Sequence, residues 1–86
     1  MNPINLQIQY VDGSVVEVST TAADFIAFEM KFDKSIATLG TDVRVTYLFF
    51  LAWAALHRTK ATDLSFEDWA ETVAMVGEFS PKESKA

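Results

Sequence analysis

The chain has 86 residues, the size of one small domain, and 50% of them are hydrophobic, which is enough for a core and argues against disorder. Its net charge of −5 disfavours binding to nucleic-acid phosphates and to anionic membrane surfaces, because both need clustered lysine and arginine. The absence of cysteine excludes disulfides, thiolate nucleophiles and cysteine-based zinc sites.

The N-terminal part of the chain predicts a β-hairpin over residues 4–18. Apolar and polar side chains alternate along its first half, which is typical of a half-buried strand. A two-residue turn would place the carboxylate of Glu17 on the apolar face. We therefore predict a three-residue turn that ends at Gly13 and pairs Ile8 with Val16, with Gly13 in the left-handed conformation.

Residues 21–33 are predicted to form the first helix. Thr21 and Asp24 have the spacing of a capping box, which satisfies backbone N–H groups at a helix start. Apolar side chains then recur at helical spacing and form one stripe, which we expect to be buried. This stripe consists of Phe25, Phe28 and Phe32, with Ile26 and Met30 beside them. A loop over residues 34–40 follows.

A second helix is predicted over residues 42–58, with Thr41 or Asp42 as its cap. Its residues from Tyr47 to Leu56 are all apolar, so apolar side chains point in every direction around the helix. The run is too short to span a bilayer, which needs roughly 20 residues. Either the domain wraps this helix on all sides, or one of its faces is kept for another protein.

We expect the two faces of this long helix to have different roles. The heavier face is predicted to pack in the core, and it carries Val45, Phe49, Trp53 and Leu56. The opposite face is the candidate for binding a partner or for self-association, and it carries Val43, Tyr47, Phe50, Leu51 and Ala54. The first helix and the hairpin could instead cover that second face, which leaves the choice between core and interface open. Uncovered, it would be an apolar patch flanked by arginine, which is typical of a protein-binding surface.

A third helix is predicted over residues 65–77, with Ser65 as its cap and Gly77 ending it. Its buried face consists of Phe66, Trp69, Ala70, Val73 and Val76. The sequence therefore predicts an α+β fold in which an N-terminal β-hairpin is followed by three α-helices packed around the central apolar helix. We expect one globular domain over residues 1–78 and a flexible polar tail over residues 79–86.

Nothing in the sequence indicates catalysis. His57 is the only histidine, and its place in the last turn of a helix is typical of a surface residue. Glu67, Asp68 and Glu71 lack metal-ligand spacing, and acidic residues in a first helical turn are what helix electrostatics favours. We therefore expect no catalytic, cofactor-binding or metal-binding residues and no enzymatic activity.

Two segments carry a resemblance to a known family. The sequence LAWAALHR at residues 51–58 is followed, after a polar gap, by FEDW at residues 66–69 and by Val73. This order resembles the tail assembly chaperones of long-tailed bacteriophages, in which an LAW-x-AL-x-R helix precedes a short F-x-x-W/F-x-x-x-V helix. The acidic and aromatic residues 24–29 fit the same pattern. The resemblance covers residues 22–78, and the hairpin matches less clearly.

The resemblance implies that the protein binds the tape measure protein and keeps it soluble during tail assembly, with the major tail protein as a second candidate partner. It implies action in the cytoplasm of the infected bacterium and absence from the mature virion. In this family a frameshift often extends the chain, and residues 79–86 are where an extension would be joined. The resemblance leaves open whether the protein forms a homo-oligomer.

Two other functions stay open. One is a small acidic inhibitor or adaptor that mimics DNA, for which the scattered acidic residues and the seven basic ones are unfavourable. The other is a structural component of the tail or of head completion, which would remain in the particle.

Overall fold

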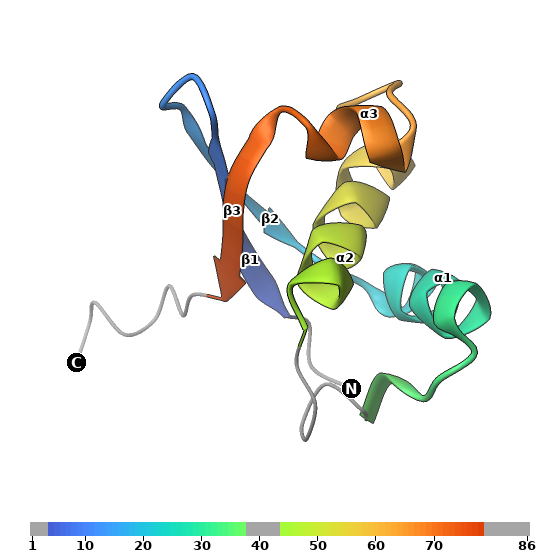
Figure 1. Cartoon of the computed structure of the whole chain (residues 1–86). Coiled ribbons are helices and arrows are strands. Elements are labelled where there is room, and N and C mark those ends of the chain that lie inside the picture. Colours follow the sequence, from blue (N-terminus) through green and yellow to red (C-terminus); the bar gives the residue numbers. More distant parts are fainter. Residues whose placement is uncertain (1–3, 38–43, 79–86) are drawn as a thin grey trace.

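A three-stranded antiparallel sheet and three helices make up the fold in this computed structural model, which describes residues 4–37 and 44–78 (Figure 1). The elements in chain order are β1 (Asn5–Tyr10), β2 (Val15–Ser19), α1 (Ala22–Phe32), α2 (Val45–Arg58), α3 (Phe66–Ala70) and β3 (Val73–Glu78). The strand order is β2-β1-β3, so β1 is central. The α+β class is confirmed, while the arrangement differs from a hairpin followed by three helices.

The hairpin has the predicted register. Ile8 pairs with Val16, and the Tyr10 N–H donates to the Ser14 carbonyl at 2.9 Å to close a three-residue turn. Gly13 ends this turn with φ of 96°, a conformation that a residue with a Cβ adopts only at a cost. The choice of a three-residue turn, made to keep a carboxylate off the apolar face, is therefore confirmed.

α1 begins where the capping-box spacing predicts, and the Thr21 N–H donates to Asp24 Oδ2 at 2.9 Å. The aromatic side of the helix faces the core, and Phe28 is fully buried. The expectation that Ile26 and Met30 share this buried stripe is wrong, because they are 58% and 80% exposed. α2 covers only the side of α1 that carries Phe28. Ile26 and Met30 therefore lie on the outer side of α1, away from α2.

α2 begins at Val45, with Arg44 as its N-cap residue. The predicted caps Thr41 and Asp42 lie outside the described residues, as do Val43 and the predicted tail over residues 79–86. The helix ends at Arg58, as the sequence predicts.

The third predicted helix is correct only in its first half. Ser65 caps it, since the Asp68 N–H donates to Ser65 Oγ at 3.2 Å, but α3 ends at Ala70 and the chain continues as β3. Gly77 pairs with Gln7 of β1 instead of ending a helix. β1 would otherwise present an unpaired backbone edge, and valine-rich residues fit a strand better than a helix, so pairing overrides the helical spacing.

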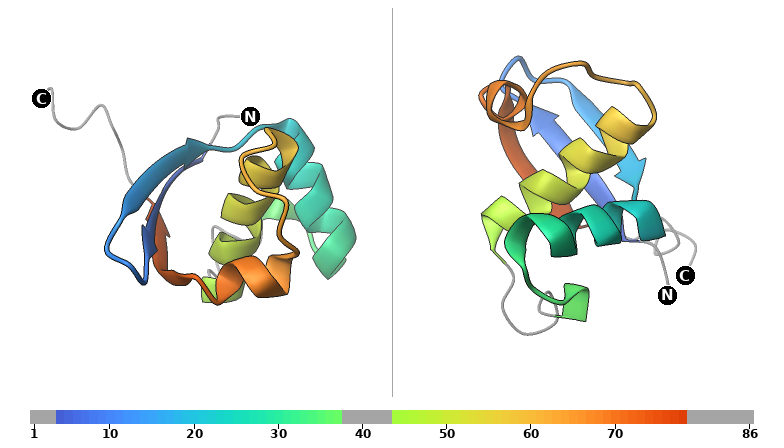
Figure 2. Two further views of the ribbon diagram at one scale, coloured as in Figure 1. Left: turned by 90° about the horizontal axis from the view of Figure 1, so that it is seen from above. Right: turned by 90° about the vertical axis from the view of Figure 1, so that its right-hand side faces the viewer.

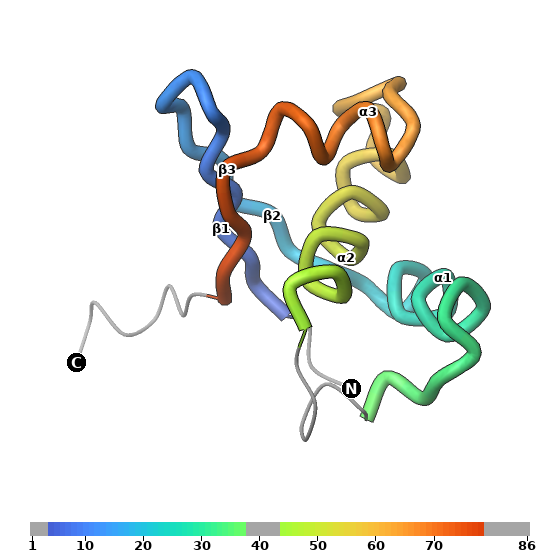
Figure 3. Tube along the Cα trace, viewed as in Figure 1, coloured from blue at the N-terminus to red at the C-terminus, as the bar shows by residue number. Residues whose placement is uncertain are grey.

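The elements form three layers. Seen from above, all the helices lie on one face of the sheet, and α2 lies between the sheet and α1 (Figure 2). β1 and β3 lie side by side although they come from opposite ends of the described chain (Figure 3). α2 is thus covered on two sides, by the sheet and by α1, which explains how a small domain buries most of a helix that is apolar all round.

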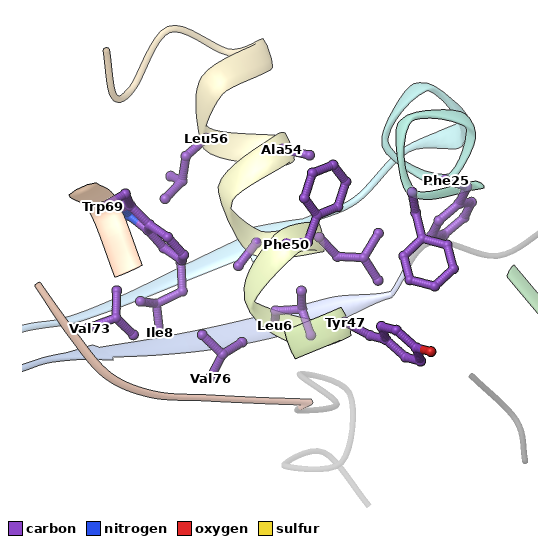
Figure 4. Close-up of a cluster of buried hydrophobic side chains, with 13 residues drawn as sticks. Leu6, Ile8, Phe25, Tyr47, Phe50, Ala54, Leu56, Trp69, Val73 and Val76 are labelled. Atoms are coloured by element: carbon purple, nitrogen blue, oxygen red, sulfur yellow. The ribbon is translucent and has the colours of Figure 1, made fainter. Parts of the chain in front are cut away.

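The structure buries the face of α2 that the sequence offered as a partner surface, and it buries the predicted core face only in part. The residues predicted as available to a partner are buried in the core: Tyr47, Phe50 and Ala54, which Figure 4 labels, and Leu51. Of the residues predicted to pack in the core, Leu56 is buried, Phe49 and Trp53 are half-buried, and Val45 is 55% exposed. Tyr47 and Phe50 face α1, where their rings contact those of Phe28 and Phe32. Of the two alternatives that the sequence left open, the one in which the first helix and the hairpin cover this face is therefore correct, and an exposed partner-binding face with Tyr47, Phe50, Leu51 and Ala54 is wrong.

Candidate binding groove between α1 and α2

A shallow groove of about 240 Å³ lies between α1 and the C-terminal half of α2. It is lined by Ala23, Asp24 and Ala27 of α1 and by Trp53, Ala54, His57 and Arg58 of α2. Ala23 and Ala27 are one helical turn apart, and their methyl groups leave room between the two helices. We call this feature the α1/α2 groove.

An ion pair lies at the end of the α1/α2 groove where α1 begins and α2 ends. Arg58 Nε donates to Asp24 Oδ1 at 3.0 Å, and Arg58 Nη2 donates to Asp24 Oδ2 at 3.1 Å, so the pair is bidentate. Asp24 is 2% exposed and also accepts the Thr21 N–H. The hydrogen bond to Asp24 raises the pKa of Arg58 above its ordinary value. The pair joins the start of α1 to the end of α2 and leaves the buried carboxylate fully satisfied.

Trp53 and His57 form the α2 wall of the groove. Trp53 is half-buried, and its Nε1 donates to the Leu64 carbonyl at 3.0 Å. Its ring stacks on that of His57, with 4.8 Å between the centroids and 28° between the planes. Phe50 and Phe66 contact the Trp53 ring at 5.7 and 5.9 Å. These contacts hold the indole in place and present an aromatic wall to the groove.

The apolar surface continues from the groove onto α1. Ile26 and Met30 are one turn apart, and helical spacing places them beside Ala23 and Ala27. We call Ile26 and Met30 the α1 strip. Met30 has the largest exposed fraction among the exposed large hydrophobic residues in the described part of the chain. Groove and strip together form one apolar surface shared by two helices.

The groove overlaps little with the predicted site. Of that set only Ala54 lines the groove, whereas Tyr47, Phe50 and Leu51 are in the core and Val43 lies outside the described residues. Sequence reasoning missed Trp53, which it assigned to the core, and the α1 side of the site. The signal that could have revealed that side is the pair Ala23 and Ala27, which are one turn apart on the first helix and line the groove beside the long helix.

The structure adds no sign of a reaction centre within residues 4–37 and 44–78. His57 is exposed, and the described contact of its side chain is the stack on Trp53. No group of three histidine, aspartate or glutamate side chains in these ranges could hold a metal ion, and this includes Glu67, Asp68 and Glu71. No helix there is long and apolar enough to cross a membrane.

Comparisons with known proteins identify no relative. No family model matches the chain, and neither the curated proteins nor the solved structures contain a significant match. The function must therefore be inferred from the groove and its surroundings.

Proposed function

We propose that the protein is a binding module that holds an apolar segment of a partner protein on the α1/α2 groove and the α1 strip, as a tail assembly chaperone holds the tape measure protein. The observation that carries this proposal is the exposure of Ile26 and Met30 on α1, whose helical spacing places them next to Ala23 and Ala27 of the groove. In this role the protein acts in the cytoplasm of the infected bacterium, before the virion is complete.

The physical requirements of such a module are met by this surface. A chaperone for an aggregation-prone client needs apolar area that its own fold does not use, and Ile26 and Met30 supply it at no cost to the core. Each Å² of apolar area that a client covers contributes about 25 cal/mol. The net charge of −5 keeps the free protein and its complex soluble.

Residues of the LAW-x-AL-x-R pattern lie both in the core and at the groove. Trp53 forms the groove wall, Arg58 is held at the groove by Asp24, and Leu51 and Leu56 are buried in the core. The pattern therefore combines residues that build the fold with residues that shape the groove, which is what a binding motif on a small scaffold requires.

Co-expression with the tape measure protein of the same phage tests the proposal. We expect the chain to move the tape measure protein from the pellet to the soluble fraction and to co-purify with it. Ile26→Glu should abolish both effects, because it places a charge on the exposed apolar surface without touching the core.

The matched control is Met75→Glu, since Met75 is 48% exposed on β3, away from the groove. It should retain full activity. A tape measure protein that stays insoluble with the unchanged chain, or equal loss in both variants, would refute the proposal. Detection of the chain by mass spectrometry in purified virions would favour a structural component instead.

A further inference from the structure

We propose that the outer edge of β2 accepts an extended segment of a partner protein as a fourth strand of the sheet, and that this segment carries a basic residue between two apolar ones. The edge belongs to the sheet and not to the two helices that form the α1/α2 groove, so the inference goes beyond the proposed function. It starts from backbone groups of β2 that the sheet does not use.

β2 is an edge strand whose backbone groups alternate between paired and free. β1 lies on one side of it, and within the described residues no strand lies on the other (Figure 2). At one end of the ladder the Thr20 N–H donates to the Ile4 carbonyl at 3.0 Å. Bonded pairs recur at every second residue of an antiparallel ladder, so the even-numbered residues of β2 bond to β1. The N–H and C=O groups of Val15 and Glu17 therefore point away from the sheet.

The opposite edge of the sheet is less regular. The ladder between β1 and β3 has a register shift between Gln9 and Tyr10, and such a bulge interrupts the outward row of backbone groups. β2 pairs with β1 without a shift over all of its residues, Val15–Ser19. β2 is therefore the edge on which an added strand can form a continuous ladder.

The side chains of β2 leave apolar area beside this edge. Val16 pairs with the buried Ile8 on the helix side of the sheet, yet it is 38% exposed because β2 is the last strand on that side. Val15, on the opposite face, is 53% exposed. The side chains of an added antiparallel strand lie about 5 Å from those of β2. Apolar residues opposite Val16 and Val18 therefore cover the area that β2 leaves open.

Glu17 determines the charge of the occupant. It is the one charged residue of β2, it is exposed, and it makes no ion pair with another described residue. Its neighbour in β1 is Gln7, followed in β3 by Gly77, so nothing in this row neutralises it. A lysine or arginine opposite Glu17 is attracted, and a carboxylate is repelled. A second copy is disfavoured, since two-fold pairing of all five residues of β2 places Glu17 against its own copy.

The blocked peptide Thr-Val-Lys-Val-Thr tests the inference on the full chain. Paired antiparallel, its lysine lies opposite Glu17 and its valines opposite Val16 and Val18. In the free chain the amide protons of Val15 and Glu17 should exchange rapidly with solvent, and saturating peptide should slow their exchange, as NMR measures. Replacing the lysine of the peptide by glutamate should weaken binding about fivefold at low salt.

Backbone N-methylation of the peptide separates strand pairing from other contacts. A methyl group on the backbone nitrogen of the lysine removes the N–H that donates to the Glu17 carbonyl, so this peptide should lose binding. A methyl group on the backbone nitrogen of the second valine lies on the outer side of the added strand and should leave binding unchanged. Equal binding of the two methylated peptides overturns the inference.

Glu17→Lys should reverse the preference between the lysine and glutamate peptides. Glu78→Lys makes the same charge change on β3 and should leave the preference as it is. A preference that survives Glu17→Lys with the fold intact by circular dichroism, or failure of both peptides to bind, overturns the inference. A dimer in sedimentation whose Val15 and Glu17 amides are protected without peptide also overturns it, because a second copy then occupies the edge. The co-expression experiment decides the proposed function separately.

Discussion

Asp24 and Arg58 form a bidentate ion pair in which the carboxylate is 2% exposed and the guanidinium side chain 34% exposed. The two residues are far apart in sequence, and their contact joins the first turn of α1 to the last turn of α2. Because Asp24 also accepts the Thr21 N–H, one carboxylate both caps α1 and holds α2 against it. The pair thereby sets the geometry of the α1/α2 groove.

Removing the arginine should destabilise the fold. Arg58→Met leaves the Asp24 carboxylate buried without its counter-charge, and breaking a buried pair costs about 3–5 kcal/mol. Since Arg58 is partly exposed, we expect the lower loss of about 2–3 kcal/mol, measured by urea unfolding. Arg58→Lys should fall in between, because an ammonium cannot make both hydrogen bonds. Lys34→Met serves as the control, and an equal loss in it would contradict this account.

Truncating a buried side chain of α2 should lower the free energy of unfolding more than truncating an exposed one. Leu51 is fully buried, so Leu51→Ala should cost about 2–5 kcal/mol. Val45 is 55% exposed, so Val45→Ala should change the free energy of unfolding by less than about 0.5 kcal/mol. Chemical denaturation of both variants measures the difference, and a larger loss for Val45→Ala would restore the assignment made from the sequence.

That assignment failed because periodicity cannot select a face in a run that is apolar all round. Weighting by side-chain size placed Phe49 and Trp53 inside, yet both are half-buried while Ala52 is fully buried. Burial on α2 is decided by where α1 and the sheet lie, which is a tertiary property. The small side chain of Ala52 fits where other layers come close, and the larger Trp53 keeps one edge on the groove.

Local signals, in contrast, were sufficient wherever the responsible residues are neighbours. The turn at Gly13, the cap of α1 by Asp24 and the cap of α3 by Ser65 each depend on contacts within a few residues. β3 was missed because Val73 and Val76 have helical spacing, and their strand pairing depends on β1 at the other end of the chain. The groove was missed for the same reason, since neither helix contains it alone.

Lys60 should limit the stability of the domain. It adopts φ of 64° at the end of α2, where the Ala61 N–H donates to the Leu56 carbonyl at 2.8 Å in a Schellman motif. A left-handed residue with a Cβ costs about 1–2 kcal/mol, and glycine regains part of this. Lys60→Gly should therefore stabilise the fold by about 0.5–1 kcal/mol in thermal or urea unfolding. Lys60→Ala removes the same charge but keeps the Cβ, so a matching gain in that variant would show that charge is the cause.

The carboxylate of Asp12 in the hairpin turn should have a pKa below its ordinary value. The Ser14 N–H and the Ser14 hydroxyl both donate to Asp12 Oδ1, at 2.8 and 2.7 Å, and these bonds lower the pKa of Asp12, the backbone N–H more than the hydroxyl. Because the folded-state pKa lies below the unfolded one of about 4, the bonds contribute to stability above that pH and are lost as the pH falls through the folded-state pKa.

Ser14→Ala removes only the hydroxyl bond. The pKa of Asp12, followed by NMR of its carboxyl carbon, should then rise but stay below its ordinary value, because the backbone N–H still donates to the carboxylate. Ser19→Ala removes another serine hydroxyl of the hairpin, which donates to Asn5 Oδ1 at 2.6 Å, and should leave the Asp12 titration unchanged. An Asp12 pKa that is the same in all three proteins would mean that the Ser14 hydroxyl bond does not persist in solution.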